Sequence, residues 1–161
     1  MIFNKIDRLY IMKRIGEIAP NFKLLSNKNE YLSLPSNSMT VLYFYPKDNT
    51  PGCTIEAKTF RDYYKEFINK NIKVFGISTD NYRSHKNFSE KYALPFPILS
   101  DIDGIVSREY GVLKNAGIYK LRNTIQRTTF LIGTDHKILY VWDKIKVAKH
   151  PQEILEKINE I

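Results

Sequence analysis

The sequence of 161 residues predicts one α/β domain with a mostly parallel central sheet flanked by helices. Two short apolar runs, Val41–Tyr45 and Lys73–Ser78, have the length and composition of strands that are covered on both faces. Between them, apolar side chains recur at the spacing of an amphipathic helix. A strand, a helix and a strand in this order indicate parallel pairing, because the helix returns the chain to the same edge of the sheet.

The chain before the first of these strands is predicted to hold an N-terminal extension and a hairpin. Residues 1–13 form the extension, and residues 14–161 form the main domain. Charged residues interrupt the apolar ones in the extension, unlike the pattern of a secretory signal. Phe22–Leu25 and Tyr31–Leu34 flank the turn-forming stretch Ser26–Asn29, so we expect a short hairpin at the periphery of the sheet.

A turn and the start of a helix follow Val41–Tyr45, and the helix carries the only cysteine, Cys53. If Thr50 or a neighbour caps this helix, Cys53 lies in the first turn, where free backbone N–H groups favour a thiolate. Alternatively, Cys53 is a small buried hydrophobe, because it shares one helix face with Ala57 and Phe60. The predicted apolar stripe of the helix consists of Phe60, Tyr63, Tyr64, Phe67 and Ile68.

The rest of the chain continues the alternation of strands and helices. In order, we expect a helix to about Tyr92 that Thr79–Asn81 can cap, a strand at Ile98–Leu99, a turn at Asp101–Gly104 and a helix at Val106–Tyr110. Residues 115–126 show no clean period and are interpreted as a loop, a candidate border of the active site. A hairpin of Arg127–Ile132 and Lys137–Lys144 follows. The last helix starts at Pro151, with an apolar face of Ile154, Leu155, Ile158 and Ile161.

Composition limits the possible functions. Hydrophobic residues make up 43% of the chain, enough for one core, and no segment approaches the roughly 20 apolar residues of a membrane span. The net charge is +8, but Lys and Arg are scattered among acidic residues, so no specific nucleic-acid partner and no membrane partner is expected. A holdase or a nucleic-acid-associated protein that uses this basic surface is the non-enzymatic alternative. The single cysteine is compatible with a reducing cytoplasm, where we expect the protein.

No cofactor or metal is expected. His85, His136 and His150 lie far apart without the spacing of metal ligands and are interpreted as surface residues, and no glycine-rich nucleotide loop is present. A thiol transferase is a competing enzyme class, but its usual Cys-x-x-Cys pattern is missing.

The stretch around Cys53 carries a specific motif. Pro46, Thr50 and Cys53 have the spacing Pro-x-x-x-Thr-x-x-Cys within Phe-Tyr-Pro-Lys-Asp-Asn-Thr-Pro-Gly-Cys-Thr. This string resembles the peroxiredoxin active site, and its Thr-Pro-Gly-Cys-Thr form resembles the bacterioferritin-comigratory-protein subgroup, also called the Q type. The resemblance extends from Gly16–Phe22 to Arg127–Ile132. It implies a thioredoxin-like fold and favours a functional Cys53 over a merely buried one.

The resemblance implies a role for each motif residue. Cys53 would attack a peroxide as a thiolate, Thr50 would hydrogen-bond the peroxide, and Pro46 would shield the pocket from water. Arg127 occupies the family's arginine position, where a guanidinium would stabilise the thiolate and orient the peroxide. From the residues alone, a helix cap, a strand terminator and a solvated charge are the structural alternatives for Thr50, Pro46 and Arg127.

The resemblance also concerns supporting polar residues and a second cysteine that this sequence lacks. Arg61 and Asp62 resemble a supporting pair around the helix, and Glu56 is expected in the same polar network. The position five residues after Cys53, often a second cysteine in Q-type peroxiredoxins, is Lys58 here. The implied function is a thiol-dependent peroxidase that reduces hydrogen peroxide or alkyl hydroperoxides through one cysteine. An external thiol, either a thioredoxin-like protein or a small thiol, would restore it, and a monomer or weak homodimer is expected.

Overall fold

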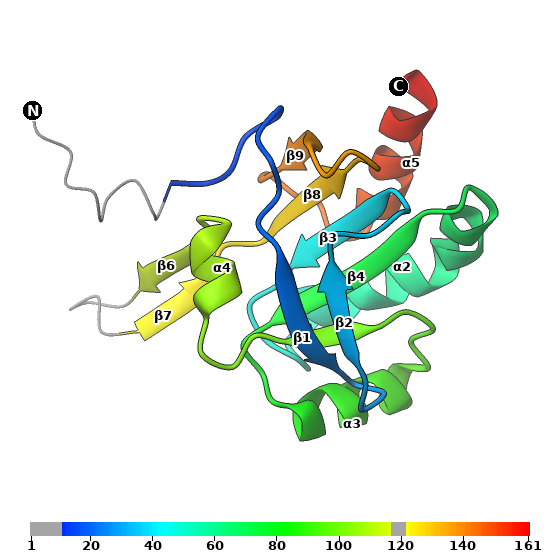
Figure 1. The fold of residues 1–161 in the computed structure, drawn as a ribbon. Coiled ribbons are helices and arrows are strands. Elements are labelled where there is room, and N and C mark those ends of the chain that lie inside the picture. The colour runs from blue at the N-terminus through cyan, green and yellow to red at the C-terminus, as the bar shows by residue number, and fades with distance from the viewer. Residues whose placement is uncertain (1–10, 117–121) are drawn as a thin grey trace, which may run out of the picture.

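The computed structural model describes residues 11–116 and 122–161 (Figure 1). The elements are β1 (Phe22–Ser26), β2 (Tyr31–Leu34), β3 (Thr40–Phe44), α2 (Pro51–Asn69), β4 (Lys73–Ser78), α3 (Tyr82–Tyr92), β5 (Ile98–Ser100), α4 (Ile105–Glu109), β6 (Leu113–Ala116), β7 (Arg122–Ile125), β8 (Thr128–Ile132), β9 (Ile138–Trp142) and α5 (His150–Glu160). No helix in these two ranges is long and apolar enough to cross a membrane.

The main sheet has the strand order β2-β1-β5-β4-β3-β8-β9. β3 and β5 each pair with β4 in parallel, whereas the neighbours on both flanks are antiparallel. The predicted mixed sheet flanked by helices is confirmed, and the hairpin β1–β2 does lie at its edge. The parallel part, however, is limited to the three central strands β5, β4 and β3, because β1 and β8 both run antiparallel to their inner neighbours.

The apolar run of β3 is explained by cover on both faces of the sheet. Val41 and Tyr43 point into a core formed with α2, α3 and α5, while Leu42 and Phe44 point into a second core that includes Tyr110 at the end of α4. Figure 1 shows α2 and α5 on one side of the sheet and α4 with the β6–β7 ribbon on the other. Every residue of the strand is therefore buried. This explains why β3 lacks the alternation of apolar and polar residues that is typical of a strand with one face in solvent.

The buried face of α2 differs from the predicted stripe. Cys53, Ala57, Phe60 and Phe67 are buried together in the core, whereas Ile68 is 53% exposed. Ile68 lies about 80° around the helix from Phe60, given 3.6 residues per turn, and so falls at the border of the buried face. The sulfur therefore belongs to the same helix face as the core side chains.

Two other expectations need correction. Residues 115–126 were predicted as a loop, but β6 and β7 form a two-stranded antiparallel ribbon, whose Ile125 is buried in the core. Residues 117–121 lie outside the described residues, so their place beside the active site stays a prediction. Ile161 was expected on the apolar face of the last helix. It is instead 63% exposed, and it follows the last residue of α5.

Residues 1–10 of the predicted extension also lie outside the described residues. The next residues contact the main domain: Met12 packs against the core, and the backbone N–H of Lys13 donates to the carbonyl of Tyr110 at 3.0 Å. Gly111 has a φ of 76°, and a Cβ there would lie 2.3 Å from the carbonyl carbon of Ile11. Only glycine therefore allows this close passage of the two backbone segments.

The sheet brings distant parts of the sequence to one edge. In the parallel pair, Phe44 of β3 lies opposite Ile77 of β4, so the segments that follow these strands emerge together. In the antiparallel pair, Phe44 lies opposite Thr128 of β8, so the residue that precedes β8 lies at the same edge. The turn into α2 and Arg127 are thus neighbours because of the strand directions.

Candidate active site

The turn between β3 and α2 places Cys53 as the third residue of the helix. Thr50 is the N-cap residue, but its hydroxyl donates to the carbonyl of Lys47 at 2.8 Å and makes no side-chain cap bond. The first backbone bond of the helix joins the N–H of Thr54 to the carbonyl of Thr50. The N–H of Cys53 therefore lies ahead of the helical ladder, at the positive end of the helix dipole, as the sequence predicts.

The sulfur of Cys53 meets a guanidinium. Cys53 is a free thiol that is only 2% exposed, and Nη2 of Arg127 donates to its Sγ at 3.3 Å. Arg127 directly precedes β8 and reaches the helix start because β8 runs antiparallel to β3. A positive side chain and the positive end of a helix dipole thus both lie beside one buried sulfur.

Glu56 completes an ion-pair network one turn further along α2. Its side chain is fully buried, and Nη1 of Arg127 donates to Oε1 at 2.7 Å. Burial raises the pKa of Glu56 to about 7, although the charge and hydrogen bond of Arg127 act in the opposite direction. Oε2 of Glu56 has no hydrogen-bond partner among the described residues, which adds to the cost of burying the charged form.

The guanidinium of Arg127 uses both arms of its fork at once. One terminal nitrogen contacts Cys53 and the other contacts Glu56. Burial acts to lower the pKa of Arg127, but the facing charges of Glu56 and Cys53 outweigh it, so the pKa is raised. The cation is permanent and is held in one orientation, which a single-point lysine charge could not reproduce.

Gly52 provides the space for this approach. A Cβ at this position would lie 3.1 Å from Nη2 of Arg127, closer than ordinary van der Waals contact. The glycine of the Thr-Pro-Gly-Cys string is therefore explained by the close approach of Arg127 rather than by the turn alone.

The remaining predicted residues separate into two groups. Thr50 and Pro46 are partly buried in the turn before Cys53, with Thr50 one helical turn ahead of it. Arg61 and Asp62 lie two turns beyond Cys53, where Nε of Arg61 contacts Asp62 at 3.1 Å and Nη1 donates to the carbonyl of Tyr92 at the end of α3. These contacts tie α2 to α3 and do not reach the sulfur.

Two histidines were misjudged from the sequence. His85 and His150 are fully buried, not surface residues. His150 lies near the site, with its Nε2 2.7 Å from the hydroxyl of Thr129 and its ring against Phe60. Burial lowers its pKa to about 3, and the charge of Arg127 acts in the same direction, so the ring is neutral. Periodicity follows apolar residues only, so nothing in the pattern marked these histidines as buried.

Comparison with known proteins identifies the family. The model of the AhpC/TSA family matches residues 15–141. The chain belongs to this family. A Coxiella burnetii protein that carries the name peroxiredoxin bcp is 42% identical over 147 residues, which cover 89% of this chain and 97% of the relative. The family and this relative confirm the predicted peroxiredoxin, a thiol-dependent peroxidase, and they do not favour a holdase or nucleic-acid role.

Solved structures confirm the thioredoxin-like fold of this peroxiredoxin. A cysteine-to-serine mutant of Xylella fastidiosa PrxQ superposes with a TM-score of 0.86 at 36% identity, covering 92% of this chain and 96% of that chain. The bacterioferritin comigratory protein of Xanthomonas campestris, studied for its alkyl peroxide reduction activity, gives 0.84 at 32% identity, covering 92% and 98%. The described architecture is thus shared over nearly the whole length of both chains.

Asp48, Asp80 and His85 form a group that could be mistaken for a metal site in this peroxiredoxin. Their ligand atoms lie within 4.8 Å of one another. However, Nδ1 of His85 lies 2.7 Å from Oδ2 of Asp48, and Nε2 lies 3.0 Å from the carbonyl of Leu99. Both ring nitrogens thus lie within hydrogen-bond distance of protein oxygens, and His85 and Asp48 form a buried pair that directly contacts within this group.

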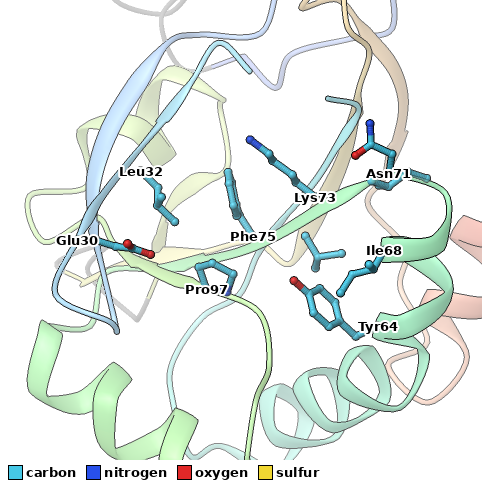
Figure 2. Close-up of a pocket in the computed structure, with 10 residues that line it drawn as sticks. Glu30, Leu32, Tyr64, Ile68, Asn71, Lys73, Phe75 and Pro97 are labelled. Carbon is cyan, nitrogen blue, oxygen red and sulfur yellow. The ribbon is translucent and has the colours of Figure 1, made fainter. Parts of the chain in front are cut away.

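A pocket of about 310 Å³ lies away from the chemistry (Figure 2). It is formed by the C-terminal part of α2, the start of β4 and the β1–β2 hairpin, with Tyr64, Lys73 and Glu30 at its wall. Tyr64 lies eleven positions after Cys53, about 16 Å along the helix at 1.5 Å per residue. The candidate site remains at Cys53, because the pocket is not lined by the cysteine, Arg127 or Glu56.

The raised pKa of Glu56 predicts a pH-dependent stability. Between its ordinary value of 4.5 and about 7, the native protein binds a proton that the unfolded chain releases. Stability should therefore fall as the pH rises through this window, by about 3 kcal/mol at 1.36 kcal/mol per pKa unit. Glu56→Gln, which cannot ionise, should lack this part of the pH dependence.

Urea denaturation at pH 4.5 to 8 measures this difference. Glu66→Gln, at an exposed carboxylate on the same helix, is the matched control and should follow the wild type. Parallel stability curves for the wild type and Glu56→Gln would contradict the raised pKa of Glu56.

Proposed function

We propose that Cys53 is the peroxidatic residue of a one-cysteine peroxiredoxin. The observation that carries this proposal is the contact of 3.3 Å between its Sγ and Nη2 of Arg127 at the start of α2. The thiolate attacks one peroxide oxygen, the S–O bond forms as the O–O bond breaks, and the leaving oxygen takes a proton to depart as water or an alcohol. Cys53 becomes a sulfenic acid.

Arg127 and Thr50 suit the two ends of a bound peroxide. The guanidinium of Arg127 can donate to the oxygen on which negative charge develops. The hydroxyl proton of Thr50 is already given to the carbonyl of Lys47, so its oxygen can accept the proton of a hydroperoxide. Pro46, which has no N–H and is partly buried, would limit the access of water to this side. Glu56 holds the arginine fork in place.

Regeneration needs a thiol from another molecule. The chain has one cysteine, so the sulfenic acid must form a mixed disulfide with an external thiol, and a second external thiol then releases Cys53. We propose a thioredoxin-like protein or a small thiol as the reductant. A free active-site thiol suits a reducing cytoplasm. We also propose that residues 14–161 act as the catalytic domain, as a monomer or weak homodimer.

Trapping the sulfenic acid tests this function. Reduced protein treated with one equivalent of hydrogen peroxide should gain about 16 Da, the mass of one oxygen, and dimedone should capture this species. Dithiothreitol should restore the starting mass and support continued peroxide consumption. Protein that gains no mass, or that reacts no faster than free cysteine, would overturn the proposal.

Position 58 predicts how a second thiol would behave. In the intact helix the Cα atoms of residues 53 and 58 lie roughly 8.6 Å apart, beyond the ~7 Å reach of a disulfide. In Lys58→Cys we therefore expect a disulfide that forms only after the first turns of α2 unwind. Its formation should follow sulfenic acid formation at a slower rate that does not depend on peroxide concentration.

Intact-mass spectrometry separates the two steps in Lys58→Cys, because the disulfide is about 2 Da lighter than the reduced protein. A variant that stays sulfenic would show that the start of α2 does not unwind. The reductant would then have to be small or flexible enough to reach Cys53 in the folded pocket.

A further inference from the structure

The turn that carries Thr50 is held by one buried side chain. Asp48 is only 5% exposed, although its neighbours Lys47 and Asn49 are exposed. The hydroxyl of Tyr45 donates to its Oδ1 at 2.6 Å, and the hydroxyl of Ser84 donates to its Oδ2 at 2.7 Å. These donors suit a carboxylate that has no proton of its own to give.

His85 on α3 is the buried partner of this carboxylate. Its side chain is fully buried, with Nδ1 2.7 Å from Oδ2 of Asp48 and Nε2 3.0 Å from the carbonyl of Leu99 on β5. Both ring nitrogens thus lie within hydrogen-bond distance of an oxygen atom, and the two side chains form a buried, directly contacting pair. Removing one side chain would leave the polar atoms of the other buried without this partner.

The backbone of the turn is fixed at the same residue. The N–H of Asp48 donates to Oδ2 of Asp80 at 2.8 Å, and the hydroxyl of Ser78 holds that oxygen at 2.6 Å. Asp48 is therefore restrained through both its side chain and its main chain, by residues of α3 and of the segment that follows β4. We call the pair of Asp48 and His85 the turn anchor.

The turn anchor sits midway between the two turn residues of the proposed site. Asp48 follows Pro46 by two positions and precedes Thr50 by two, and the hydroxyl of Thr50 is bonded to the carbonyl of the residue before Asp48. Within the described part of the chain, no other side chain of residues 46–50 forms a buried ion pair. The position of the Thr50 oxygen thus depends on where the anchor holds Asp48.

We propose that His85 is a positioning residue for peroxide reduction, which acts through Asp48 to hold the Thr50 hydroxyl beside Cys53. The inference rests on the proposed function, since it assigns His85 to the peroxide step of that site. His85 itself touches neither the sulfur nor Arg127. Its loss should slow the reaction with peroxide and leave the intrinsic reactivity of the thiolate unchanged.

Two substitutions separate the two hydrogen bonds of His85. The amide nitrogen of asparagine lies as many bonds from the backbone as Nδ1, so His85→Asn keeps a donor toward Asp48. The amide nitrogen of glutamine corresponds to Nε2, so His85→Gln keeps only the donor toward the carbonyl of Leu99. Both variants remove the ring and one bond. They differ in whether Asp48 keeps its partner.

Stopped-flow oxidation of Cys53 by hydrogen peroxide is the first readout. A misplacement of about 1 Å can slow a reaction by about 100-fold, so we expect His85→Gln to react about 10- to 100-fold more slowly than the wild type. His85→Asn should recover most of that loss. Ser89→Ala, which removes a buried hydroxyl from the same helix without touching Asp48, should keep the wild-type rate.

Alkylation of Cys53 by iodoacetamide is the second readout, because it requires the thiolate but no peroxide-binding hydroxyl. Its rate should be the same in the wild type and His85→Gln. In a Thr50→Val background, His85→Gln should cause no further loss in the peroxide rate, because the two changes remove the same interaction.

The outcomes are separable. Peroxide and alkylation rates that fall together in His85→Gln, or losses that multiply with Thr50→Val, would overturn the inference in favour of a general structural role. A peroxide rate in His85→Gln equal to that of a fast wild type would overturn the inference alone. A wild type no faster than free cysteine would overturn the proposed function, and the inference with it.

Discussion

Replacing Cys53 with serine is expected to abolish peroxide reduction and to leave the fold intact. The chain has no other thiol, and a serine hydroxyl is not ionised at neutral pH, so no nucleophile remains. Loss of a catalytic nucleophile costs on the order of 10,000-fold or more. Serine differs from cysteine by one atom and can still accept the hydrogen bond of Arg127, so the unfolding free energy should change by about 1 kcal/mol or less.

Peroxide consumption with dithiothreitol as reductant measures the first effect, and urea denaturation measures the second. Peroxide consumption in Cys53→Ser above the uncatalysed background would contradict the assignment of the nucleophile. A large loss of unfolding free energy in Cys53→Ser would instead show that the thiol contributes to the stability of the core.

Replacing Arg127 with glutamine should produce the second largest loss. The guanidinium is the only described cation in contact with the sulfur, and removal of one donor to a developing negative charge costs about 100- to 1,000-fold in rate. Glu56 would also lose its partner inside the protein, which costs about 3 kcal/mol or more when the remaining charge is buried. One substitution is thus expected to lower both the rate and the stability.

A second substitution separates these effects. In the double variant Arg127→Gln/Glu56→Gln, neither partner is charged, so most of the lost stability should return while the peroxide rate stays low. Arg127→Lys should fall between the wild type and Arg127→Gln, because one ammonium cannot occupy both positions of the fork. Arg83→Gln, which removes an exposed charge from α3, controls for net charge. A double variant that recovers the rate would exclude Arg127 from the reaction.

Much of the fold could be predicted, because the central strands are covered on both faces and therefore consist of continuous apolar runs. Val41–Tyr45 and Val74–Ser78 are buried, and the apolar runs predicted β3 and β4 to within one residue. The ribbon of β6 and β7 was missed, because its sequence shows no alternation, although Ile125 and Leu113 pack against the core. The number of antiparallel pairs at the flanks of the sheet was underestimated, because the composition of a strand does not indicate its direction.

The site was predictable where it lies in one stretch of sequence and much less so where it depends on long-range contacts. Cys53 and Thr50 belong to one motif, and helix geometry places them one turn apart. Arg127 is 74 positions from Cys53, and only the family resemblance connected the two before the register of β8 explained the contact. Asp48 and His85 were missed, because a buried ion pair leaves no periodic trace in the sequence.

At position 52, the residue that would best stabilise the helix differs from the residue that allows Arg127 to contact the sulfur. Glycine is a poor helix former, and the backbone of Gly52 does not require it, since its φ is not positive. Alanine would strengthen the start of α2, yet its methyl group would push the guanidinium of Arg127 away from Sγ. Selection for a more stable helix alone would therefore remove this glycine. Glycine at position 52 thus keeps the contact between Arg127 and Cys53 at the cost of a weaker helix start.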